Sequence, residues 1–528
     1  MNAAITTNTS ACTAALYLSA RGSGEVALAA HAARDRLSRA RLLSWEADGV
    51  TVAAAVTTSA RDMLRRGLPW VMLVGAVVLF AIYSFPGFMS ADSAEQLFQA
   101  RANRYTDWHP PLMAVMWHYA DKIIAGPVLM WLAQGLGFLV GTILILRSRL
   151  SLRRSVVVAS LIFVSPPMLS QLAVVWKDCQ MAAFFVLGAG LLALRKPRWT
   201  VVGCILLAIA TAERVNAPAA SLPLVLGMFQ WKAAWSRSRN AVVGFGVWVV
   251  IVLAGLGVNR AFTDEETHPW HSSLALFDIV GTLRWQGGAS DAELRRILDG
   301  IPNTPHDQIR HRFVQVYTPV VWWQLSHAET AVIGTPVTPE QRAAVSRAWR
   351  ESIARFPRAY VRHRGLVIRN LLGLIDDVPM GAVWRVRGAP ESLLPLKLDP
   401  HSPASQTALG DAMESVQDTL PFRAWLYFAI SLALLWFARR DTLVFSLVAS
   451  GVLYECTLFI AAPSSDFRYS HWMIATSIIA AILFFTSRWR MGRRKDRLAR
   501  DQRISQPWGP DSTPRRPPPR DGYVIPSP

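Results

Sequence analysis

Long apolar segments separated by short, arginine-rich loops restrict the fold of this chain more than any other feature. A helix needs ~20 mostly apolar residues to cross the hydrocarbon core of a bilayer. Ten segments of this kind are predicted: 68–88, 127–146, 155–176, 179–194, 199–212, 217–231, 241–261, 421–438, 442–463 and 471–487. The chain is also 52% hydrophobic and only 17% charged, which is too apolar for an ordinary soluble domain. We therefore expect an all-α polytopic membrane protein with about ten transmembrane helices and the lipid bilayer as a partner.

One predicted span, 155–176, contains the adjacent prolines Pro166 and Pro167. Proline has no backbone N–H and its ring clashes with the preceding helical turn. We expect this helix to be kinked or to end early.

Lysine and arginine are unevenly distributed over the short loops. With a cytoplasmic N-terminus, the inner loops hold twelve of these residues and the short outer loops hold six. Cytoplasmic loops carry the excess of positive charge in membrane proteins. This pattern predicts a multi-pass protein of the bacterial inner (plasma) membrane with both termini in the cytoplasm. It also accounts for the net charge of +19 without a nucleic-acid partner.

The predicted spans divide the chain into regions. We expect a disordered cytoplasmic segment at 1–67, a transmembrane catalytic region at 68–261 with its first outer loop at 89–126, a small, mainly helical extracytoplasmic domain at 262–420, transmembrane helices at 421–487, and a basic, proline-rich cytoplasmic tail at 488–528. Within the extracytoplasmic domain, "SLALFDIVGTL" has the composition of a strand.

Other chemistries lack a motif. The four cysteines, Cys12, Cys179, Cys204 and Cys456, are scattered and predict buried free thiols rather than disulfides or a zinc site. The sequence has no Walker loop, no glycine-rich dinucleotide fingerprint and no metalloprotease histidine pair.

Unusual polar residues lie in the predicted outer loops, within "SADSAEQLFQA", "TDWHPPL", "WKDCQ", "AERVNAP" and "PSSDFRYSHW". The candidate site residues are Asp92, Glu95, Asp107, His109, Lys177, Asp178, Arg214, Asn216, Asp466, Arg468 and Tyr469. Ionisable residues near a membrane are costly and commonly mark a polar cavity with a function. We expect one outward-facing site shared by several loops.

The individual motifs leave alternatives open. Asp92 is either a general base or the cap of the helix that follows it. "TDWHPPL" is either a plain turn before a helix that starts at the prolines, or a site in which Asp107 and His109 lie at the amino end of that helix and help to hold a phosphate-bearing ligand. Lys177, Arg214 and Arg468 suit a lipid phosphate, but each could equally form a salt bridge at the interface.

Together, the "DWHPPL", "WKD", "ERVNAP" and "SSDFRYSHW" segments resemble integral-membrane glycosyltransferases of the GT-C class, especially an uncharacterised bacterial branch. Protein O-mannosyltransferases and bacterial aminoarabinose transferases belong to the same class. The resemblance implies inverting transfer of a sugar from a polyprenyl-phosphate donor to an extracytoplasmic acceptor, which is a lipid, glycan or protein hydroxyl. It implies Asp92 as general base and the cations as stabilisers of the leaving phosphate. His109 and Asp107 would shape the pocket.

The chain departs from the mannosyltransferase pattern of adjacent Asp and Glu, because Ser93 follows Asp92 and Glu95 is the nearest second acid. The base is therefore Asp92 or Asp107. No cofactor is predicted with certainty; some members of the class use a divalent metal, but one carboxylate and one histidine do not define a site. The alternative function is a non-catalytic, flippase-like or transporter-like membrane protein of cell-envelope polysaccharide assembly.

Overall fold

The computed structural model describes residues 66–232, 234–327, 331–375, 377–385, 396–398 and 403–505, with side chains up to 489. Predictions for Cys12, for nearly all of segment 1–67 and for the end of the tail lie outside these residues. The chain divides into two units, Met1–Val71 and Met72–Pro528. All the contacts described below lie within the second unit.

The described residues form helices and no β-sheet. In chain order, a helix at Arg66–Ser84 is followed by α2 (Ala91–Ala102), α3 (Leu112–Ile123), α4 (Val128–Arg147), α5 (Leu152–Phe163), α6 (Pro166–Leu172), α7 (Lys177–Ala193), α8 (Pro197–Glu213), α9 (Ala217–Met228) and α10 (Arg237–Phe262). Two isolated bridges, Phe88 with Val174 and Thr106 with Glu265, are the strand-like pairings in this part of the chain.

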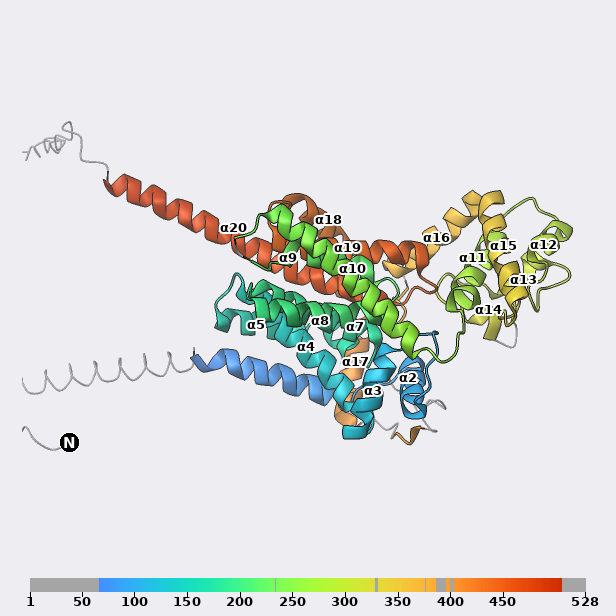
Figure 1. Cartoon of the computed structure of the whole chain (residues 1–528), viewed down its shortest axis with the longest axis horizontal. Helices are drawn as coiled ribbons and strands as arrows, with labels where there is room; N and C mark the ends of the chain where they lie inside the picture. Colours follow the sequence, from blue (N-terminus) through green and yellow to red (C-terminus); the bar gives the residue numbers. More distant parts are fainter. Residues whose placement is uncertain are drawn as a thin grey trace, which may run out of the picture. The chain divides into compact units, whose positions relative to one another are not determined.

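A second group of helices follows α10. These are η1 (Trp270–Leu274), α11 (Ala275–Leu283), α12 (Asp291–Leu298), α13 (Ile309–Val316), α14 (Gln324–His327), α15 (Pro339–Arg355), α16 (Pro357–Leu371) and α17 (Ala404–Glu414). Helices α11, α12, α13, α15 and α16 pack against one another (Figure 1). The chain then continues through η3 (Leu420–Phe422), α18 (Ala424–Phe437), α19 (Thr442–Ala461), η4 (Phe467–Ser470) and α20 (His471–Ser505).

The strand expected for "SLALFDIVGTL" is wrong, because these residues end η1 and form α11. Every residue of α11 is buried, since the helix packs against α13, α15 and α16. A short run that is mostly apolar can be either a buried helix or a buried strand, and its composition does not distinguish the two.

Five helices in the described part of the chain are long and apolar enough to cross a membrane. They are Arg66–Ser84, Val128–Arg147, Arg237–Phe262, Thr442–Ala461 and Phe467–Trp489. Helices α5 and α6 bend by 72° at the break before Pro166, as the proline pair predicts, and would make a sixth span if counted as one. The predicted count of ten is not confirmed. Helices α7 and α8 have 17 residues each, ~26 Å of helix, slightly less than a bilayer core.

Close packing of the central helices depends on glycine. Helix α7 packs against α4 and α8, and α9 packs against α19. A Cβ added at Gly141 would lie 2.5 Å from the backbone nitrogen of Leu187, and one added at Gly203 would lie 2.9 Å from the carbonyl oxygen of Gly188. Small residues let helix backbones approach this closely. Helices α7, α8, α9, α19 and α20 lie together in one bundle (Figure 1).

Candidate functional site

The start of α2 is fixed onto the segment that precedes α7. Phe88 N donates to Ala173 O at 2.9 Å, and Val175 N donates to Phe88 O at 3.0 Å. Ser90 caps α2 together with Ser93, and Trp176 Nε1 donates to Ser90 Oγ at 2.7 Å. Capping therefore belongs to Ser90, and Asp92 lies in the first helical turn with its carboxylate free for other partners.

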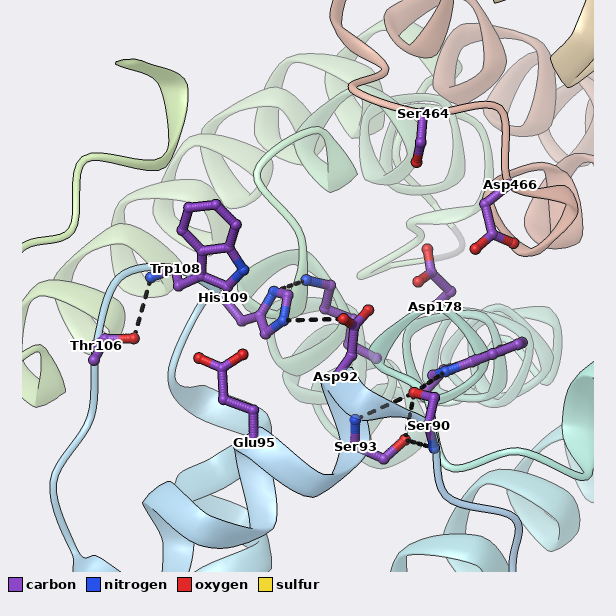
Figure 2. A network of polar contacts seen from close by, with 12 residues as sticks. Ser90, Asp92, Ser93, Glu95, Thr106, Trp108, His109, Asp178, Ser464 and Asp466 are labelled. Atoms are coloured by element: carbon purple, nitrogen blue, oxygen red, sulfur yellow. Dashed lines mark hydrogen bonds and ion pairs between the residues drawn. The ribbon is translucent and has the colours of Figure 1, made fainter. Parts of the chain in front are cut away.

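Asp92 contacts basic groups from two other segments. Arg468 Nη2 lies 2.7 Å from Asp92 Oδ2, and His109 Nε2 lies 3.9 Å from Oδ1. The Asp92 side chain is 31% exposed, whereas those of Arg468 and His109 are 13% and 9% exposed. Figure 2 shows Asp92 and His109 pointing toward one another, with Glu95 beside them. A partly accessible carboxylate is thus surrounded by nearly buried basic groups.

Electrostatics keep Asp92 ionised. Burial by itself raises the pKa of this carboxyl, but the Arg468 guanidinium group, with a smaller contribution from the Lys177 ammonium group, outweighs burial and holds the pKa below its usual range. Asp92 is therefore a carboxylate at neutral pH that can accept a hydrogen bond or a proton, although it is a weak base while Arg468 contacts it.

Lys177 and His109 form a buried pair next to Asp92. Lys177 Nζ donates to His109 Nδ1 in a short contact, so the ring proton of a neutral His109 lies on Nε2, which faces Asp92. Burial and the Lys177 charge lower the pKa of His109 well below its ordinary value. Burial and the Arg214 charge lower the pKa of Lys177 to about 7. His109 is neutral, and Lys177 titrates near neutral pH.

Arg468 is held on several sides. Its Nε lies 3.0 Å from Asp466 Oδ2, and its backbone N–H donates to Asp466 Oδ1 at 3.1 Å. Its guanidinium group lies over the Trp176 ring at 4.8 Å and the Tyr469 ring at 5.4 Å. One arginine thus connects two carboxylates and two aromatic rings, which fixes its position beside Asp92.

A second ion pair lies next to the first. Arg214 Nη1 and Asp178 are 3.0 Å apart, and the Arg214 guanidinium group lies over the Tyr469 ring at 4.8 Å. Tyr469 therefore lies between the two arginines, while its hydroxyl is 3.1 Å from Ser464 Oγ. Asp178, Ser464 and Asp466 face the same space as Asp92 and His109 in Figure 2.

Three predicted site residues have other contacts. The Asp107 carboxylate accepts from the backbone N–H and hydroxyl of Thr267, the latter at 2.6 Å, so it holds the turn rather than the ionic cluster. Asn216 donates to Thr457 Oγ1 at 3.0 Å, which connects α9 to α19. Glu95 accepts from Gln99 at 3.2 Å, and burial and then the Asp92 charge raise its pKa.

The "TDWHPPL" stretch is a turn, and α3 begins directly after Pro111.

Three buried polar residues close in sequence to the ion-paired residues were not among the predicted site residues. The carboxylate of Glu213, the amide of Gln180 and both ring nitrogens of His471 are buried without a hydrogen-bond partner in the described part of the chain. Such groups commonly contact water or a ligand. Each residue lies in one of the motifs "AERVNAP", "WKDCQ" and "SSDFRYSHW", next to charged residues. That position was the feature of the sequence that could have identified them as site residues.

No group of three or more His, Cys, Asp or Glu side chains that could hold a metal ion is found among the residues described by the structure.

Comparisons with family models, curated proteins and solved structures give no match to this chain. The chemistry of the site is therefore inferred from its own residues.

Proposed function

We propose that this protein is a membrane glycosyltransferase that moves a sugar from a polyprenyl-phosphate donor to an extracytoplasmic acceptor hydroxyl. One observation carries the proposal: the ionised, partly exposed Asp92 contacts the nearly buried Arg468. His109 lies between Asp92 and Lys177 and contacts both of them. A proton acceptor next to fixed cations suits a reaction in which a hydroxyl loses its proton and a phosphate leaves.

In the proposed reaction, the acceptor oxygen attacks the anomeric carbon as its proton passes to Asp92. The bond between that carbon and the phosphate oxygen breaks, and the configuration inverts. The leaving polyprenyl phosphate is stabilised by Lys177, Arg214 and Arg468. If Arg468 moves from Asp92 toward the phosphate, Asp92 becomes a stronger base at the moment the proton must be taken.

The decisive experiment is transfer of radiolabelled sugar from a polyprenyl-phosphate sugar to cell-envelope material by membranes that contain the full-length protein. We expect labelled product in proportion to the amount of protein and none in membranes that lack it. A protein that carries the labelled lipid across vesicle membranes, without forming product, would instead be a transporter or flippase.

Topology gives a second test. We propose ten spans, with residues 262–420 outside and both termini inside, because the ion-pair site and the arginine-rich loops lie at opposite ends of α7, α9 and α19. We expect a periplasmic reporter to be active when fused at residue 300 and inactive at residue 236, with the cytoplasmic reporter giving the reverse. Equal activity at both points would contradict this topology.

The pH dependence of donor binding gives a third test, through Lys177. A lysine with a pKa of about 7 loses its charge as the pH rises from 6 to 8.5, whereas a donor phosphodiester stays anionic. We expect the donor KM to rise over this range by several-fold, up to roughly 30-fold if only the ammonium form binds. Lys177→Arg keeps its charge and should flatten the profile. A steep profile in both proteins would mean that another group titrates.

A further inference from the structure

An arginine-lined cavity lies at the opposite end of the helices from the ion-pair site. Its volume is about 1600 Å³. Among the residues that line it are Arg149, Arg195, Arg237, Arg439, Arg440 and Arg488. It lies near the carboxyl ends of α7 and α9 and the amino end of α19, whereas Lys177, Asn216 and Thr457 lie at or near the other ends of these helices.

The charge of this cavity is only partly balanced. Asp441 is the acidic residue in its lining, and it pairs with Arg149 at 3.0 Å. Arg195, Arg237, Arg440 and Arg488 are exposed and make no ion pair with any residue that the structure describes. Several arginines around one hollow favour an anion with more than one acceptor oxygen, because each guanidinium group offers a planar fork of donors.

Apolar surface adjoins the arginines. Trp436 and Phe437 line the same cavity, and their exposed fractions are 66% and 61%. Arg439 lies over the Trp436 ring at 4.8 Å. Large exposed aromatic side chains beside cationic ones are typical of the level of a membrane at which a lipid headgroup meets its acyl chains. A soluble phosphate compound has no acyl chain to cover the exposed Trp436 and Phe437 side chains.

We propose that this cavity is a binding site for the headgroup of an anionic phospholipid, whose phosphate contacts Arg195, Arg440 and Arg488 and whose acyl chains lie on Trp436 and Phe437. The site is separate from the proposed catalytic centre and does not depend on the identity of the transferred sugar. On the topology proposed above, it draws its lipid from the cytoplasmic leaflet, where anionic lipids bind basic segments.

The test measures lipid retention by full-length protein that has been purified in a non-ionic detergent and depleted of lipid. Phosphatidylglycerol and phosphatidylcholine are titrated separately, and bound lipid is counted by native mass spectrometry. We expect phosphatidylglycerol to bind with one or a few saturable sites and phosphatidylcholine to bind weakly. The variant Arg195→Gln/Arg440→Gln/Arg488→Gln should lose on the order of 10- to 100-fold in affinity for phosphatidylglycerol.

A matched control removes equal charge outside the cavity. Arg147→Gln/Arg153→Gln/Arg154→Gln changes three exposed arginines at the end of α4 and the start of α5 that do not line the cavity, and we expect less than about a threefold loss. Equal losses in both triple variants would overturn the site in favour of general surface charge. Displacement of the lipid by an equal concentration of inorganic pyrophosphate would overturn the lipid assignment.

Two measurements protect the test against misfolding. Elution volume and thermal unfolding of each variant are compared with those of the parent protein. Arg195→Lys/Arg440→Lys/Arg488→Lys retains the charge, and we expect it to keep most of the affinity. Partial retention of affinity in this variant, with normal elution and unfolding, would show the contribution of charge, and an affinity for phosphatidylglycerol no higher than that for phosphatidylcholine would overturn the assignment to these three residues.

Discussion

Asp92→Asn is expected to lower the rate of sugar transfer by roughly 10²- to 10⁴-fold, the usual contribution of a general base. Asparagine preserves the size of the side chain but cannot accept the proton of the acceptor hydroxyl. The donor KM should change much less than kcat, because the cations that contact the phosphate remain. The measurement is the initial rate of radiolabelled product formation at saturating donor.

Asp107→Asn is the matched control for this loop. Asp107 contacts Thr267 and none of the ionic cluster, so its replacement should weaken the turn and leave the rate within about tenfold of the parent value. If Asp107→Asn is inactive while Asp92→Asn retains full activity, the base has been assigned to the wrong residue. Full activity of both variants would contradict a catalytic role for this loop.

Arg468→Gln is the second change with a large expected effect. The substitution leaves Asp92 and Asp466 without their shared cation, and transfer should fall by about 10²- to 10³-fold through loss of charge stabilisation. It should also change the pH profile. Without Arg468 the pKa of Asp92 rises, and the residue becomes protonated, hence inactive as a base, as the pH falls.

The expected signature is therefore a new acidic limb in the pH–rate profile of Arg468→Gln that is absent from the parent protein. Arg385→Gln is a suitable control, because Arg385 also pairs with two carboxylates, Asp411 and Glu414, and is equally 13% exposed. We expect Arg385→Gln to be less stable than the parent protein, and we expect its pH–rate profile to have no acidic limb. An acidic limb in both variants would point to general destabilisation.

Sequence reasoning found most of the charged cluster but not its pairing. Asp92, Lys177 and Arg468 could be placed together because alternating apolar runs predict which loops share a membrane face. Which acid meets which base depends on helix packing, and a single sequence does not encode that in any local pattern. The contact of Asp107 with Thr267 was missed for this reason, as was the burial of the Glu213 carboxylate without a hydrogen-bond partner among the described residues.

The fold shows the same division. The bend before Pro166 follows from proline chemistry alone, so it could be predicted. The helix α11 could not, because a mostly apolar run of nine residues is too short for its pattern to distinguish a helix from a strand. The number of spans is difficult for a related reason: short helices such as α9 and α18 are apolar enough for a membrane but have only 12 and 14 residues.

The pairing of Phe88 with the segment before α7 has a consequence for how such a protein can diverge. Asp92 and Lys177 each follow this short backbone bridge by a few residues, so the spacing between acid and cation is set locally. Residues 262–420 contact this region at few points, one of which is Trp384 Nε1 donating to Met89 O at 3.3 Å, so substitutions that keep this contact are expected to leave the bridge in place. On the proposed function, related proteins that act on different acceptors would share this backbone bridge and the spacing that it sets between acid and cation.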